Sequence, residues 1–203
     1  MTSVRQQNFL LRKEKILAMA ETLLLDNNQD ITLSELATEL DIAKGTIYKH
    51  FKSKNQLYLE LIILNETRLL EISQKHNNDI KTYVSEYMLY NMLNSNRTIL
   101  LHVIEERLTN NERKLKELFE KLYQIREQRI IEIKDMTSDY LTSLDSAMSI
   151  RDYLSYVWTV TYGASLLLNS THYQKSIGSR ERLIKLYVNQ ALMTPDKISH
   201  AAL

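Results

Sequence analysis

A short basic segment carries the side chains whose chemistry is easiest to interpret. Residues 21–41 contain six acids and no lysine or arginine, whereas residues 44–54 contain four lysines and no acid. In the second range Ile47 and Phe51 suit a core, which leaves polar or small neighbours to face outward: Lys44, Gly45, Thr46, Tyr48, Lys49 and His50. Donors of these types bind phosphate oxygens and base edges. We predict that they contact nucleic acid, although charge alone fits a solvated face equally well.

Two short helices are needed to present this segment. Thr32 and Glu35 have the spacing of a capping box, in which each side chain takes up a free backbone N–H group of the other residue. The box predicts a helix over residues 33–40. Asp41, a residue type that tolerates a left-handed backbone, then precedes a second helix over residues 44–50. The pattern is that of a helix-turn-helix.

A third helix should follow at once. Ser53 and Gln56 form a second capping box, which places Lys54 in the first turn of a helix over Asn55–Ser73. A lysine there opposes the helix dipole, so a partner outside the helix should favour it. We expect a DNA phosphate to be that partner. Together with Thr32, Lys54 completes the set of predicted DNA contacts.

The start of the chain carries further positive charge. A helix is expected over Val4–Leu25, and basic residues gather near its start: Arg5, Arg12, Lys13 and Lys15. These residues also oppose the helix dipole. A phosphate partner and solubilising surface charge explain them equally well, so we treat them as secondary contacts.

The segment resembles the helix-turn-helix signature of the tetracycline-repressor (TetR) family of dimeric bacterial transcription regulators. Residues that agree in type and spacing lie within about residues 10–60: Leu36, Ala37, Ile42, Gly45, Thr46, Ile47, Tyr48, His50, Phe51, Lys54 and Leu57. Asp41 departs from the glycine that is usual in the turn. The resemblance implies a homodimer that binds a palindromic operator in double-stranded DNA, and a ligand cavity in a larger helical domain.

Composition favours an all-α protein. The 203 residues include three glycines, one proline and no cysteine, which leaves little material for tight hairpins and excludes disulfides and thiolate metal sites. No apolar run approaches the roughly 18 residues of a membrane span, and no signal peptide is recognisable. We expect a cytoplasmic protein without a membrane partner.

The polar run His76–Asp79 indicates where the larger domain begins. We predict a three-helix DNA-binding domain over residues 1–54, a connecting helix over 55–75, and a helical ligand-binding and dimerisation domain over 76–203. Within that domain, helices are expected over Ile80–Leu93, Arg97–Leu108, Glu112–Met136, Ile150–Asn169 and Arg180–Met193.

The last two predicted helices are apolar on more than one face. A terminal helix of this kind needs a second apolar partner, and the small residues Gly163–Ser165 would let another helix approach closely. We expect a homodimer formed through these two helices. The alternative is that both helices lie in the middle of a monomer core.

Aromatic and flexible side chains of the larger domain are candidates for an effector site, since rings supply contact area and their polar tips orient a ligand. They are Tyr87, Met88, Met92, His102, Tyr123, Trp158 and Tyr162. Taken singly, each fits a core position as well. The effector is an unknown small molecule, and we expect it to relieve repression.

Two other classes of function remain to be weighed. His102, Glu105 and Glu106 lie within one helical turn, but they lack the second histidine of a metal-binding helix motif, and three glycines leave no phosphate loop or dinucleotide fingerprint. We expect no enzyme, metal or cofactor. A helical adaptor for protein partners has the same composition, but it gives no reason for exposed donors over residues 46–50.

Overall fold

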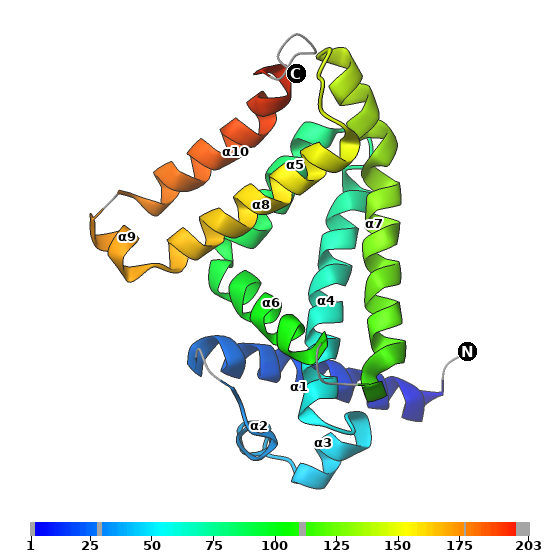
Figure 1. Cartoon of the computed structure of the whole chain (residues 1–203). Coiled ribbons are helices and arrows are strands. Elements are labelled where there is room, and N and C mark those ends of the chain that lie inside the picture. The colour runs from blue at the N-terminus through cyan, green and yellow to red at the C-terminus, as the bar shows by residue number, and fades with distance from the viewer. Residues whose placement is uncertain (1–2, 28–29, 110–112, 177, 198–203) are drawn as a thin grey trace. The chain divides into compact units, whose positions relative to one another are not determined.

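A computed structural model describes residues 3–27, 30–109, 113–176 and 178–197 of the chain. Within these residues every regular element is helical (Figure 1). The elements are α1 (Val4–Asn27), α2 (Leu33–Glu39), α3 (Lys44–His50), α4 (Lys54–Lys75), α5 (Ile80–Leu93), α6 (Ser95–Thr109), a short 3-10 helix (Arg113–Leu115), α7 (Lys116–Ser143), α8 (Ile150–Asn169), α9 (Thr171–Ser176) and α10 (Arg180–Lys197). The predicted all-α class is confirmed.

The chain forms two compact units. Residues 1–64 and 100–121 make up unit 1, and residues 65–99 and 122–203 make up unit 2. Because these limits fall inside α4, α6 and α7, each of those helices supplies residues to both units. The predicted domains, 1–54, 55–75 and 76–203, run consecutively along the chain. The predicted limits divide the chain by function, which the two compact units do not test, so these domains remain a prediction.

In unit 1 the capping box predicted at the start of α2 is present, whereas in the one predicted at the start of α4 the Gln56 side chain accepts from the Lys52 N–H and not from Ser53. The Glu35 N–H donates to the Thr32 hydroxyl over 3.1 Å, and the Thr32 N–H donates to the Glu35 carboxylate over 2.7 Å. These hydrogen bonds form the capping box at the start of α2. Hydrogen bonding of the Glu35 carboxylate to the Thr32 backbone N–H, and to a lesser degree to the Thr32 side chain, lowers the pKa of Glu35, because it favours the charged form.

The turn between α2 and α3 is a Schellman motif. Asp41 has a φ of 49°, its N–H donates to the Thr38 carbonyl over 3.1 Å, and the Ile42 N–H donates to the Ala37 carbonyl over 3.0 Å. These two bonds satisfy the last free carbonyls of α2 and reverse the chain. Asp41 therefore takes the left-handed position that glycine usually occupies.

In unit 2 the core is built mainly from α5, α8 and α10, which pack against one another. α5 is largely buried, with Val84, Met88 and Met92 fully enclosed. Arg180 ties α10 to α5, since its guanidinium donates to the carbonyls of Met92 and Leu93 over 3.0 and 3.2 Å. Those carbonyls end α5 and have no partner within the helix.

A buried ionic cluster joins α4 to α7 within unit 2. The Glu66 carboxylate is 7% exposed and accepts hydrogen bonds from Arg126 at 3.0 Å and from Arg129 at 3.3 Å. The Arg129 guanidinium also lies over the Tyr87 ring, 5.5 Å from its centroid. Burial alone would lower the pKa of Arg129, but the Glu66 carboxylate together with Tyr87 and Tyr83 outweighs burial and raises that pKa. The arginine is charged.

Some predicted helix limits were wrong. α7 was expected over Glu112–Met136 but runs from Lys116 to Ser143, and residue 112 lies outside the described part of the chain. It continues because Tyr140 and Leu141 extend its buried stripe. The buried Thr137 hydroxyl fits within the helix because it donates a hydrogen bond to the Ile133 carbonyl over 2.6 Å. α9 was not predicted at all. Polar residues dominate its six positions, and Tyr173 alone of them is buried.

Replacing Glu66 by alanine should destabilise unit 2 by about 3–5 kcal/mol, because Arg129 would keep its charge in a buried site without its carboxylate partner. The matched control is Glu71→Ala, at an exposed position of the same helix, which should change stability by less than about 0.5 kcal/mol. Urea denaturation of both variants provides the comparison. Similar losses in the two variants would contradict this role of Glu66.

Candidate nucleic-acid interface

The helix α3 is anchored by two apolar side chains. Ile47 is fully buried, as is Phe51 directly after the helix, and both belong to the core of unit 1. The N–H of Phe51 donates to the Ile47 carbonyl over 2.9 Å and closes the helix. The remaining residues of α3 are consequently held on a surface, as the sequence predicts.

That surface carries most of the predicted contact residues. Lys44, Gly45, Tyr48 and Lys49 are exposed, whereas Thr46 is half-buried. Tyr48 is a large aromatic residue with 44% of its surface open to solvent. No packing within unit 1 requires these particular side chains. Their role as DNA contacts stays a prediction.

Gly45 has no structural role that would require glycine. A Cβ atom built on it meets nothing within 4 Å, and its backbone is helical. Glycine inside a helix costs about 0.5–1 kcal/mol relative to alanine. The open space at Gly45 therefore favours a partner that approaches the backbone of α3 closely.

His50 is less open than the sequence predicts. Its imidazole stacks on the ring of Phe9 from α1, with centroids 4.1 Å apart, and its Nδ1 is buried without a hydrogen-bond partner. Burial lowers the pKa of His50, and the charges of Arg12, Lys13 and Lys49 lower it further. The imidazole is thus neutral near pH 7 and serves first as a packing contact between α1 and α3.

Lys54 has a partner inside the protein. Its ammonium lies 2.9 Å from the Asp30 carboxylate and 5.6 Å from the centroid of the Tyr58 ring. The Tyr58 hydroxyl donates to Asp30 over 3.0 Å, and Arg107 of α6 donates over 3.3 Å. We call Asp30, Lys54, Tyr58 and Arg107 the Asp30 cluster. Burial would raise the pKa of Asp30, but hydrogen bonds from the other three outweigh it and lower that pKa.

Sequence reasoning missed this cluster. Asp30 and Lys54 are 24 residues apart, and no local pattern connects them. The unfavourable place of Lys54 near the start of α4 was the available signal, but it was assigned to a phosphate. Thr32 similarly has a structural role in its capping box. Lys54 and Thr32 remain predicted DNA contacts, and each also has a structural role within the protein.

The seven candidate ligand residues differ in burial and are divided between the two units. Tyr87, Met88 and Met92 are buried in the core of unit 2. The rings of Trp158 and Tyr162 stack with centroids 5.6 Å apart, and Trp158 is 50% exposed. The other two are Tyr123, which is 50% exposed, and His102, which is half-buried and falls in unit 1.

Near Tyr87 the sequence analysis missed a charged residue, Arg129. The ring of Tyr83 lies 6.0 Å from that of Tyr87, and the Arg129 guanidinium lies over Tyr87. The sequence does carry a signal for Arg129, because this arginine lies at helical spacing within an apolar stripe, seven residues after Leu122 and four before Ile133. A charge in such a stripe needs a buried partner, and here the partner is Glu66.

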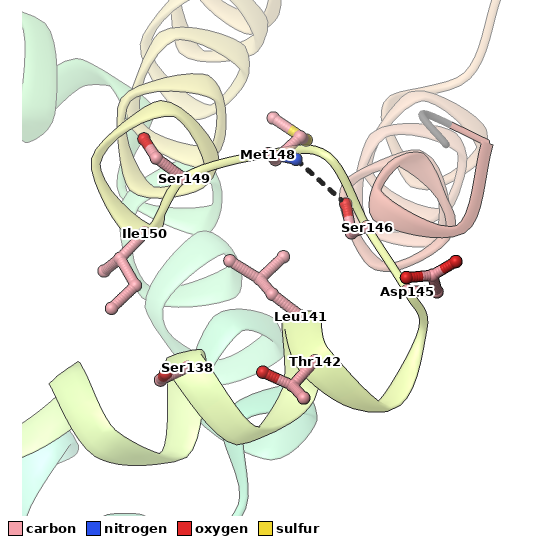
Figure 2. A pocket seen from close by; sticks show the side chains of 8 residues that line it. All are labelled: Ser138, Leu141, Thr142, Asp145, Ser146, Met148, Ser149 and Ile150. Atoms are coloured by element: carbon pink, nitrogen blue, oxygen red, sulfur yellow. Dashed lines mark hydrogen bonds between the residues drawn. The ribbon is translucent and has the colours of Figure 1, made fainter. Parts of the chain in front are cut away.

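A surface hollow of about 340 Å³ lies where α7 turns into α8 (Figure 2). Hydroxyl-bearing residues, apolar residues and one aspartate line it: Ser138, Leu141, Thr142, Asp145, Ser146, Met148, Ser149 and Ile150. Several of its polar atoms already have partners, for example Ser149, whose hydroxyl caps α8 by accepting the Asp152 N–H at 3.1 Å. None of the seven candidate ligand residues lines this hollow. We assign no ligand to it.

Membrane spans and metal sites are two other features that bear on function. Across the described residues no helix is long and apolar enough to cross a membrane. In the same part of the chain, no three histidine, aspartate or glutamate side chains are grouped closely enough to hold a metal ion. This applies to His102, Glu105 and Glu106 on α6 as well.

The stacked position of His50 predicts a pKa below 6.5 for its imidazole in the free protein. Since the folded state then binds this proton less readily than the unfolded chain, His50 should favour folding above about pH 6.5, and this contribution should be lost as the pH falls below that value. Phe9→Ala should raise the pKa by returning water to the ring. NMR titration of the imidazole measures both values. A midpoint at or above 6.5 in the unmodified protein would contradict the prediction.

The comparisons with known proteins concern this same region. Residues 16–61 match the model of a family described as bacterial regulatory proteins, tetR family. Over 82 residues the chain is 34% identical to the HTH-type transcriptional regulator QacR of Staphylococcus aureus (strain Mu50 / ATCC 700699), and the match covers 40% of this chain and 44% of that protein. The chain thus matches less than half the length of this relative. The family match begins within α1, contains α2 and α3, and ends within α4. The N-terminal region of the chain, over residues 16–61, is thus similar to the TetR family of bacterial regulatory proteins.

Proposed function

We propose that this protein is a transcription regulator that binds double-stranded DNA through α3. The observation that carries the proposal is the division of α3 into a buried anchor and an exposed face. Ile47 is enclosed by unit 1, whereas Lys44, Gly45 and Lys49 are open to solvent. An α-helix of this kind fits the major groove, where donors reach base edges and phosphates. In a bacterium the protein would meet its DNA in the cytoplasm.

The two other classes explain these residues less well. An adaptor that binds protein partners gives no reason for lysines beside an exposed glycine in a helix of seven residues. An enzyme would need catalytic groups, and the family that residues 16–61 match is one of regulatory proteins. DNA binding accounts for the basic charge, the open glycine and the family match together.

The proposed functional unit is a homodimer formed through α8 and α10. Both helices pack within unit 2 yet leave large apolar side chains exposed: Trp158, Leu166 and Leu167 on α8, and Leu186 and Met193 on α10. Of the small-residue patch, Ala164 and Ser165 are buried within the protomer, but a Cβ atom on Gly163 would meet nothing within 4 Å. A second copy packed on these faces would cover the exposed apolar surface.

We further propose that the regulator is a repressor released by a small-molecule effector bound in unit 2. The stacked pair Trp158 and Tyr162, together with Tyr123, offers the aromatic surface that such molecules use. An effector can change DNA affinity only to the extent that it binds one conformation of the dimer more tightly than another, and operator DNA must then weaken effector binding by the same factor.

Gly45→Ala is the sharpest test of DNA binding. The variant should be at least as stable as the unmodified protein, because the added methyl group meets open space and alanine favours the helix. Its affinity for duplex DNA should fall by about tenfold, the effect of losing one charge-assisted hydrogen bond worth about 1.5 kcal/mol. Fluorescence anisotropy with labelled duplexes measures the affinity, and thermal unfolding measures the stability.

The matched control for this test is Gln128→Ala, an exposed position of α7 in unit 2, where alanine brings a smaller gain in helix propensity and should leave DNA affinity unchanged. DNA affinity that is equal in the Gly45 variant, the control and the unmodified protein would remove α3 from the interface. Absence of salt-dependent duplex binding by the unmodified protein would overturn the proposed function itself.

Gly163→Glu tests the dimer. A glutamate at this position can extend into solvent in a free protomer, but a helix–helix interface would bury its charge. We expect a shift from dimer to monomer in sedimentation equilibrium without loss of helical content. Gln128→Glu adds the same charge on α7 and should leave the dimer intact. The proposal fails if the unmodified protein is a monomer at micromolar concentration, or if the Gly163 variant dimerises as tightly as the control.

A further inference from the structure

The helix α1 begins well before its first buried residue. Its first buried residues are Ile16 and Leu17, whereas residues 3–12 are all exposed. The family match likewise starts at residue 16. We call residues 4–12 the α1 arm. Burial of apolar surface does not explain why this arm continues the helix.

Two side chains hold the arm and its junction against the end of α3. Phe9 stacks on His50, with ring centroids 4.1 Å apart. One turn later, Lys13 forms an ion pair with Glu60 and lies 5.5 Å from the centroid of the Phe51 ring. The arm therefore lies beside the segment that is proposed to read DNA, and all of these residues belong to unit 1.

The face of the arm that contacts α3 is also its basic face. Arg5 lies four residues before Phe9 and Arg12 lies three residues after it, so the three side chains share one side of the helix. Both arginines are exposed. The positive field reaches α3, since Arg12 and Lys13 help to lower the pKa of His50. Arg5 lies in the first turn of α1, where a cation costs about 0.3–1 kcal/mol, so a partner outside the protein should favour it.

We infer that the α1 arm is a second DNA-contacting element, in which Arg5 and Arg12 bind backbone phosphates next to the groove that α3 enters. The inference rests on the proposed function and extends it to a surface outside the helix-turn-helix. Duplex DNA is the occupant that fits, because the arm's basic face continues directly into Lys49 and the other donors of α3 through the contact of Phe9 with His50. Phosphates there would be bound without regard to sequence.

The test is the double variant Arg5→Ala/Arg12→Ala of the full chain, titrated with a mixed-sequence DNA duplex over a range of salt concentrations. If each arginine neutralises one phosphate, the slope of log affinity against log salt should become shallower by about 1.8 per subunit. Relative affinities for different sequences should stay the same. The control Lys121→Ala/Lys134→Ala removes two exposed positive charges from α7 and should keep the original slope.

The outcomes separate the inference from the function on which it rests. Equal slopes for the arm variant and the α7 control, with strong salt dependence in the unmodified protein, would overturn the α1 arm alone. No duplex binding by the unmodified protein would overturn both. Because Arg5 and Arg12 are exposed, the arm variant should unfold at the same temperature as the control. Arm-dependent binding to anionic lipid vesicles, with an unchanged DNA slope, would assign the arm to a membrane surface and contradict the inference.

Phe9→Ala provides an independent readout, since it removes the contact that holds the arm beside α3 but leaves every arginine and lysine in place. If the arm acts through its position, this variant should lose part of the same salt dependence. An unchanged slope in Phe9→Ala would show that placement by the aromatic stack is not needed, and would contradict the proposed geometry.

Discussion

The geometry of unit 1 depends on the carboxylate of Asp30. Tyr58 is fully buried, and its hydroxyl donates to Asp30 while accepting the N–H of Ile31 over 3.1 Å. Burial is the main cause that raises the pKa of Tyr58 to about 12, so the hydroxyl keeps its proton over the physiological range. Lys54 and Arg107 bind the same carboxylate. The Asp30 carboxylate thereby connects the start of α2 to α4 and α6.

This arrangement changes the meaning of the positive charge around α3. Lys54 is partly compensated by Asp30, and Lys13 by Glu60, so neither ammonium is a bare charge awaiting a phosphate. Arg5 and Arg12 are exposed, as are Lys44 and Lys49. The residues with structural partners set the position of α3, and the exposed ones offer charge to a partner outside. The sequence alone does not separate the two groups.

What the sequence predicts well is local. The capping box of α2 and the extent of α3 follow from residues fewer than five apart, and the left-handed turn at Asp41 follows from the tolerance of its residue type. What it does not predict is long-range. The contact of His50 with Phe9 spans 41 residues, and that of Arg129 with Glu66 spans 63. Pairings of that kind are set by how helices pack, which no short pattern in the sequence encodes.

The candidate effector site shows the same limit. Residue type correctly marks Tyr87, Met88 and Trp158 as large, adaptable side chains, but only packing decides that the first two are enclosed and the third is half-exposed. Helix ends are similarly governed by tertiary contacts, as the extension of α7 to Ser143 illustrates. The predicted contact face of α3 is easier to recognise, because its two buried anchors, Ile47 and Phe51, stand out in the sequence as apolar positions.

The central claim is that α3 reads specific sequences in duplex DNA as part of a two-fold dimer. Selection of bound fragments from sheared bacterial genomic DNA by the full chain, followed by footprinting of the recovered fragments, tests it most directly. The account predicts enrichment of fragments that share a palindrome or near-palindrome, with protected half-sites separated by about 34–36 Å, or a multiple of one helical turn. Recovery of fragments with no shared sequence, or no enrichment over the input DNA, would contradict it.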